Sequence, residues 1–101
     1  GKDIVVDDEV SIEWARIPHF YYDFYVYQYA TGFSAAIDFS EKILSEGESA
    51  VEKYKGFLKS GSSDYPIDVL KKAGVDMTSK QPVDSALKLF DKLLNEMESL
   101  I

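Results

Sequence analysis

The residues best suited to chemistry lie close together between positions 18 and 29. This stretch holds the only histidine of the chain and five of its seven tyrosines. A neutral phenol or an imidazole N–H can donate a hydrogen bond to a substrate, or to an oxyanion that forms during a reaction. The alternative is structural, because dense aromatic residues are more often packing residues than a site. From the residue types alone, packing is favoured and both interpretations stay open.

Other catalytic groups are scarce. The chain has no cysteine, and its single histidine cannot supply the two histidines of an H-E-x-x-H zinc motif. Ser11, His19 and Asp23 form a triad only on paper, because no serine has the context of a nucleophile elbow. Helix ends or solvated faces explain four groups of carboxylates, at residues 7–9, 38–41, 46–48 and 95–98. By themselves, these residues are not expected to bind a metal or to hydrolyse a peptide.

Two adjacent runs, Glu13–Tyr22 and Phe24–Gly32, carry a family resemblance that continues through Ile43–Gly47, Phe57–Gly61 and Leu70–Met77. Over nearly its whole length the chain resembles the C-terminal part of oligoendopeptidase F, a zinc metallopeptidase related to thimet oligopeptidase. The likeness is specific, because a Pro-His-Phe-Tyr-Tyr run followed by Phe-Tyr-Val-Tyr is improbable by chance.

The resemblance implies roles that the residues alone do not. In this family the H-E-x-x-H motif and a later glutamate bind zinc upstream of the segment that this chain resembles. A histidine and tyrosines face the zinc from the opposite wall. Carried over, His19, Tyr22 and Tyr25 are the expected catalytic residues, and Tyr27 and Tyr21 are expected to bind substrate. The spacing differs among branches of the family, so the role of each tyrosine stays open.

The resemblance therefore implies the C-terminal portion of a cytoplasmic, zinc-dependent metalloendopeptidase that hydrolyses short peptides. Zinc is expected in the parent enzyme and not on this chain, which is expected to be inactive alone. The expected partners are a short peptide, the remainder of the peptidase chain and, for the fragment, a second copy of itself. The alternative is a non-catalytic helical interaction module that docks through its aromatic stripe.

Charge and length restrict the choice further. The net charge of −7 argues against binding to nucleic acid and against a polybasic contact with a membrane. No apolar run approaches the roughly 20 residues that span a bilayer. The 101 residues are enough for one small domain, and since they do not begin with Met we expect a piece of something longer.

The elements that must position the site are predicted to be helices. Apolar residues recur at three- and four-residue spacing, and proline, glycine and basic residues mark the ends. The expected class is all-α, a helical bundle fragment of a larger, mainly helical peptidase. A single C-terminal segment of the catalytic domain is expected over 1–101, with helices at about 8–15, 20–46, 48–59, 65–73 and 82–100.

The aromatic residues are predicted to lie on the long helix over 20–46 and just before it. Helical spacing sorts them onto two sides, with His19, Tyr22, Val26 and Tyr29 on one and Phe20, Phe24 and Tyr27 on the other. A helix that is apolar on several sides is normally buried by more than one neighbour. We therefore expect this region to pack against something outside the 101 residues.

Overall fold

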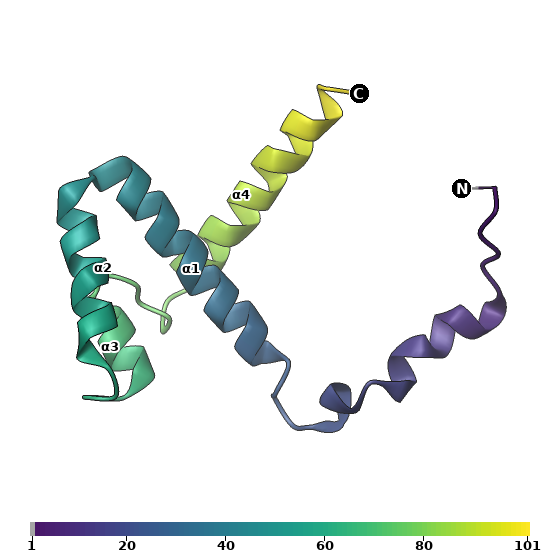
Figure 1. Cartoon of the computed structure of the whole chain (residues 1–101), viewed down its shortest axis with the longest axis horizontal. Coiled ribbons are helices and arrows are strands. Elements are labelled where there is room, and N and C mark those ends of the chain that lie inside the picture. Colours follow the sequence, from purple (N-terminus) through teal and green to yellow (C-terminus); the bar gives the residue numbers. More distant parts are fainter. Residues whose placement is uncertain (1) are drawn as a thin grey trace.

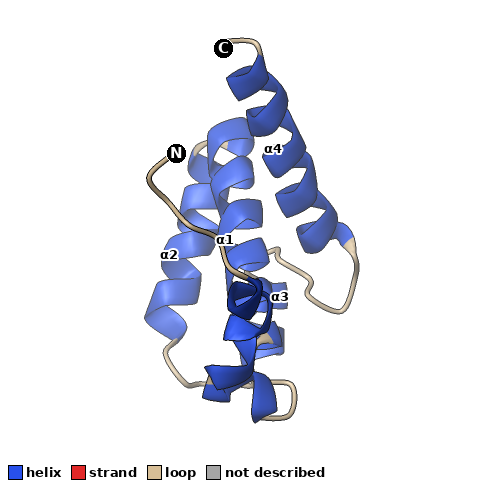
Figure 2. Ribbon diagram, turned by 90° about the vertical axis from the view of Figure 1, so that its right-hand side faces the viewer, coloured by secondary structure: helices blue, strands red, loops and turns tan. Residues whose placement is uncertain are grey.

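The computed structural model describes residues 2–101, and the only regular elements in that range are helices (Figures 1 and 2). The prediction of an all-α fold is confirmed. Two 3-10 helices, η1 and η2, precede four α-helices. The two 3-10 helices are η1 (Asp8–Arg16) and η2 (Pro18–Tyr21). The four α-helices are α1 (Tyr27–Glu46), α2 (Glu48–Ser60), α3 (Pro66–Lys72) and α4 (Gln81–Glu98). No helix within residues 2–101 is long and apolar enough to cross a membrane.

Helix α1 is the element on which the bundle, residues 27–101, is built. α2 folds back beside α1, α3 packs against α2, and α4 crosses α1 before it projects away (Figure 1). The reversal between α1 and α2 occurs at Gly47, whose φ of +67° is in the left-handed region that favours glycine. Helices α2 and α4 thus pack directly on α1, and α3 packs on α2.

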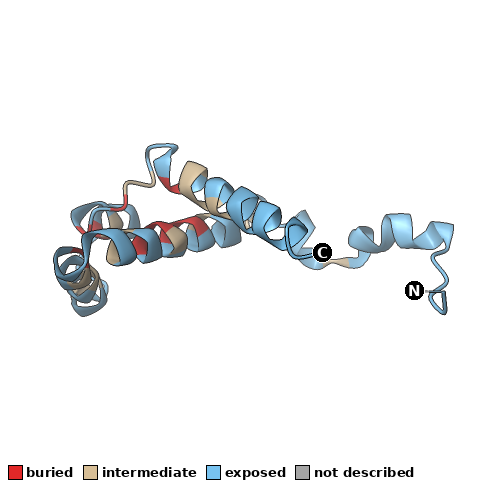
Figure 3. Cartoon of the chain, turned by 90° about the horizontal axis from the view of Figure 1, so that it is seen from above, coloured by how far each residue is buried: buried red, intermediate tan, exposed pale blue. Residues whose placement is uncertain are grey.

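The apolar core is small and lies where α1, α2 and α3 meet. Phe39 is its centre, and its ring centroid lies 5.2 Å from that of Tyr54 and 5.3 Å from that of Phe57. Val75, in the loop after α3, is fully buried against the same cluster. Burying a side chain of this kind contributes about 1.5–3 kcal/mol. Figure 3 shows the buried residues gathered in this part of the molecule.

A buried carboxylate joins α1 to α4. Asp38 is 1% exposed and accepts hydrogen bonds from Lys42 Nζ at 2.8 Å and Gln81 Nε2 at 2.6 Å. Ser85 Oγ lies 3.5 Å from the same carboxylate, and Lys42 also donates to the carbonyl of Gly74. The expectation that the carboxylates at 38–41 lie on a solvated face is wrong for Asp38. Its main donor from α4 is 43 residues away, which a local pattern does not reveal.

Residues 2–26 form an arm that extends away from the bundle (Figure 1). Neither η1 nor η2 buries a residue, and the two helices contact chiefly each other. The aromatic side chains of the arm are therefore exposed, Phe24 by 80%. Within residues 2–101 nothing covers the apolar surface that the sequence places here.

The long helix predicted over 20–46 begins seven residues later than expected, at Tyr27. Residues 22–26 form a bend and turns, and Phe24 has a φ of +60°, which no helical residue adopts. Aromatic residues lose side-chain freedom in a helix and have only moderate helix propensity, and Asp23 is a common turn residue. The predicted arrangement of His19, Tyr22 and Val26 on one α-helical stripe with Tyr29 is therefore wrong.

Candidate functional site

The rings of His19, Tyr22 and Tyr25 form one cluster. The His19 ring stacks on that of Tyr25, with centroids 5.4 Å apart and planes 29° apart. The Tyr22 ring meets both edge-on, at 6.4 Å from His19 and 6.2 Å from Tyr25. These are favourable aromatic contacts. The three residues predicted to be catalytic are thus neighbours in space, although not through the helix that was expected to carry them.

Consecutive turns of the backbone bring these rings together. Pro18 begins η2, where its fixed φ suits the first helical position. The N–H of Tyr22 then donates to the carbonyl of His19 at 3.4 Å, and the N–H of Tyr25 to that of Tyr22 at 3.1 Å. Each bond closes a turn whose first and last residues carry rings in contact, His19 with Tyr22 and Tyr22 with Tyr25. The three-residue spacing therefore does locally what an α-helix was predicted to do.

Tyr29 extends the cluster from the first turn of α1. Its ring lies edge-on to that of Tyr25, with centroids 5.9 Å apart. A side-chain hydrogen bond with Tyr25, together with the charge that Tyr25 would carry, raises the pKa of Tyr29 above its ordinary value of 10.0. A phenol with a raised pKa stays protonated, and so remains a donor, throughout the neutral range. From the sequence we predicted no role for Tyr29. Its position four residues after Tyr25 was the signal that could have indicated this contact.

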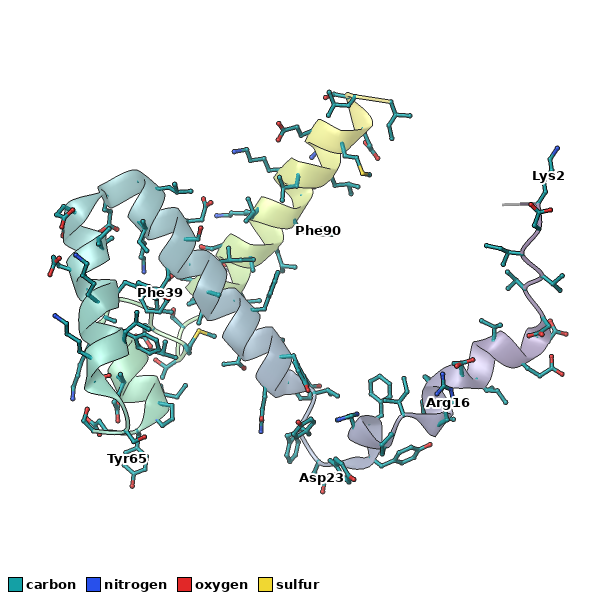
Figure 4. The ribbon with its side chains drawn as sticks, in the orientation of Figure 1. Lys2, Arg16, Asp23, Phe39, Tyr65 and Phe90 are labelled. Carbon is teal, nitrogen blue, oxygen red and sulfur yellow. The ribbon has the colours of Figure 1, made fainter. Side chains whose placement is uncertain are left out.

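The two tyrosines predicted to bind substrate lie outside this cluster. The hydroxyl of Tyr21 donates to the carbonyl of Ala15 at 2.7 Å and so ties η2 to η1. Tyr27 begins α1, and its side chain is 69% exposed. Figure 4 shows the turn around Asp23 just before the start of α1 and away from the bundle. All five predicted site residues in the arm are therefore exposed or half-buried. Only three of them, His19, Tyr22 and Tyr25, form the ring cluster.

The residues present do not fit a zinc site. Among residues 2–101, no three histidine, cysteine, aspartate or glutamate side chains lie close enough together to hold a metal ion. The single histidine is in contact with phenol rings, which are not among the usual protein ligands of zinc. The chemistry that this cluster offers is hydrogen-bond donation from phenol O–H and imidazole N–H groups.

A hollow of about 520 Å³ lies on the bundle between α1, α2 and α3. Its walls are mainly apolar and include Phe39, Ile43, Tyr54 and Leu70. None of the five predicted site residues lines it. The hollow is therefore separate from the ring cluster.

Residues 1–89 match the family model described as Peptidase family M3. The chain belongs to this peptidase family. It is 61% identical over 101 residues to oligopeptidase PepF of Bacillus subtilis, and 55% identical over 93 residues to the chromosomal oligoendopeptidase F of Lactococcus lactis subsp. cremoris. The matches cover 100% and 92% of this chain. The resemblance to oligoendopeptidase F is thus confirmed.

A solved structure gives the same result for the fold. The crystal structure of oligoendopeptidase-F from Enterococcus faecium superposes with a TM-score of 0.81 at 53% identity, over 93% of this chain and 18% of that one. The chain spans about 15% of the length of the two curated relatives named above. It corresponds to one part of these M3 peptidases.

Proposed function

We propose that this chain is the C-terminal part of a zinc-dependent oligoendopeptidase and supplies side chains that bind the peptide and its oxyanion. The observation that carries the proposal is the ring cluster of His19, Tyr22 and Tyr25, in a chain of peptidase family M3. Zinc, which activates water and polarises carbonyls in peptidases, belongs in this proposal to residues outside the chain. The parent enzyme is proposed to act on short peptides in the cytoplasm.

The cluster is suited to stabilising negative charge. When water attacks a peptide carbonyl, charge develops on the carbonyl oxygen, and donors already held in place stabilise it most. Tyr22 and Tyr25 can each donate an O–H without carrying a charge, and His19 can donate a ring N–H. Contacts between the three rings restrict their rotation, which lowers the cost of arranging the donors.

Replacing the phenol oxygens in the full-length enzyme tests these roles. We expect Tyr22→Phe and Tyr25→Phe each to lower kcat by about 10²–10³-fold, the usual effect of losing one oxyanion donor, while the melting temperature changes little. Tyr65→Phe is the matched control, because this exposed tyrosine precedes α3 on the bundle. Normal peptide hydrolysis by both variants would remove the assigned roles.

Substrate binding by Tyr27 and Tyr21 is a separate part of the proposal. A hydrogen bond to bound peptide that is equal in ground and transition states affects KM and not kcat. We expect Tyr27→Phe in the full-length enzyme to raise KM by about 3–10-fold, which corresponds to one net hydrogen bond. Tyr21→Phe also loses its bond to Ala15, so its melting temperature is measured beside its KM. An unchanged KM in both variants would exclude contact with substrate through these hydroxyls.

We also propose that the 101 residues alone hydrolyse no peptide. Within residues 2–101 no three histidine, cysteine, aspartate or glutamate side chains could hold the metal ion that this peptidase chemistry requires. The check is a peptide hydrolysis assay of the isolated chain with added zinc, beside the full-length enzyme as positive control. Turnover by the isolated chain that survives re-purification would contradict the proposal and indicate a nucleophile within these residues.

A further inference from the structure

Helix α4 uses only part of its surface within the bundle. Pro82 is buried at its start, Ser85 reaches Asp38, and Ala86 and Leu89 are half-buried near α1. From Phe90 to the end of the chain every residue is exposed, and the helix projects away from α1 (Figures 1 and 3). The rest of α4 is therefore without a partner in the described part of the chain.

The exposed apolar residues of α4 follow a strict pattern. Spacings of four and three alternate along a seam made of Val83, Leu87, Phe90, Leu94, Met97 and Ile101. Their exposed fractions run from 39% for Leu94 to 98% for Ile101. This alternation is the a/d repeat by which one helix packs lengthwise against another. An elongated occupant that lies along α4, such as another helix, therefore fits this seam.

The two rows beside the seam differ completely in chemistry. One row consists of Asp84, Asp91 and Glu98, and the other of Ala86, Leu93 and Leu100. Asp84 lies 3.5 Å from Lys80 Nζ, whereas Asp91 and Glu98 have no ion-pair partner within residues 2–101. In paired helices these flanking rows decide which partner is accepted. An acidic row beside an apolar seam favours a partner that carries lysine or arginine opposite it.

A second copy of α4 does not meet this requirement. Antiparallel pairing would bring the two acidic rows together, which is repulsive. Parallel pairing would place Asp91 and Glu98 against the apolar row of the other copy, where carboxylates lose water without gaining a donor. The occupant must therefore be a different helix.

We propose that the seam of α4 binds an α-helix of the longer peptidase chain, from outside these 101 residues, with basic residues facing Asp91 and Glu98. This proposal rests on the proposed function in one respect, which is that the helix comes from the same peptidase chain. The curated relatives are several times longer than this chain, so they contain further segments that could supply it. The chemistry of the partner follows from α4 alone. A self-association of the fragment is accordingly not expected through this seam.

The test measures binding of the 101-residue chain to two synthetic helical peptides of about three heptads, each labelled with a fluorophore. Both have the same apolar a/d residues, but one carries lysine and the other glutamate in the flanking rows. We expect the lysine peptide to bind about tenfold more tightly by fluorescence anisotropy. The preference should disappear at about 1 M salt, where charges are screened within about 3 Å.

Charge-reversal variants show whether the acidic row is responsible, rather than the net charge of the chain. Asp91→Lys/Glu98→Lys should reverse the preference between the two peptides. Glu41→Lys/Glu96→Lys changes the net charge equally, at exposed positions off the seam, and should leave the preference for lysine intact. Leu94→Asp should abolish binding of both peptides.

Two outcomes would overturn the proposal. The first is equal affinity of the unchanged chain for both peptides at low salt. The second is a dimer, detected by sedimentation, that Leu94→Asp dissociates, because the seam would then belong to a second copy. Neither measurement involves hydrolysis, so this failure is distinct from a failure of the proposed peptidase role.

Discussion

The arm and the bundle are stabilised in different ways. In the bundle, Phe39 and Val75 are buried where three helices meet, and Asp38 joins α1 to α4 across 43 residues of sequence. In the arm, turns of three residues and ring-to-ring contacts hold His19, Tyr22 and Tyr25, with no buried residue in η1 or η2. The residues suited to chemistry are thus arranged locally and are not anchored to the core of the bundle.

This difference has a physical consequence for the proposed site. Loops and exposed turns open at lower free-energy cost than a packed core. A cluster held by its own rings keeps its internal arrangement, but its position relative to a peptide must be fixed by surfaces that cover the arm. We therefore expect the rest of the peptidase to contact the exposed aromatic faces of the arm.

The largest expected effect comes from truncating the same residue type in the two regions. Phe39→Ala should destabilise the chain by about 3–5 kcal/mol, because it removes a buried ring and leaves a cavity. Phe24→Ala, at an exposed position of the arm, should change the free energy of unfolding by no more than about 0.5 kcal/mol. Urea unfolding followed by circular dichroism measures both. Equal destabilisation by the two variants would mean that the arm is part of the folded core.

A smaller effect is expected at the joint between α1 and α4. Asp38→Ala removes the acceptor for Lys42 and Gln81 and should cost about 2–3 kcal/mol, because hydrogen bonds to a charged acceptor are lost. Glu41→Ala, at an exposed position of the same helix, is the control. Hydrogen exchange should rise at the start of α4 and in the loop after α3. Unchanged exchange there would show that the carboxylate does not fix the crossing of the helices.

The smallest effect is expected from pH, and only in the bundle. Hydrogen bonds from the Thr78 side chain, from Lys71 and from the Thr78 N–H lower the pKa of Asp76 to about 2. The ionised form is favoured in the folded chain, so its contribution is present above about pH 4 and is lost as the pH falls towards 2. We expect Thr78→Val to flatten the dependence of melting temperature on pH in this window. If the melting temperature of Thr78→Val depended on pH as that of the unchanged chain does, the loss of stability at low pH would come from other carboxylates.

The sequence predicted the later helices well because their ends carry local signals. The helices expected over 48–59 and 82–100 are found at Glu48–Ser60 and Gln81–Glu98, where Gly47, Gly61 and Pro82 mark boundaries. Glycine in a left-handed conformation and proline in a first turn act through the backbone of a few residues. Such signals do not depend on what the rest of the chain does.

Two features could not be predicted for opposite reasons. The turns at 22–26 are a local preference that overrides the helical spacing of the aromatic residues, and Phe24 at positive φ has no signature in the sequence. The burial of Asp38 is a long-range event, because its donor Gln81 lies on another helix. For the site, the residue types and the family resemblance nominated the three clustered rings. The spacing alone did not separate them from Tyr21 and Tyr27.

The turns that join His19 to Tyr25 also determine how this segment can change. Each turn is closed by one backbone hydrogen bond, from the N–H of Tyr22 to His19 and from the N–H of Tyr25 to Tyr22. An insertion or deletion between these residues would change a turn and so separate the rings, even if every aromatic residue were kept. A substitution elsewhere in the segment leaves the number of residues in each turn unchanged. The length of this segment is therefore more constrained than its composition.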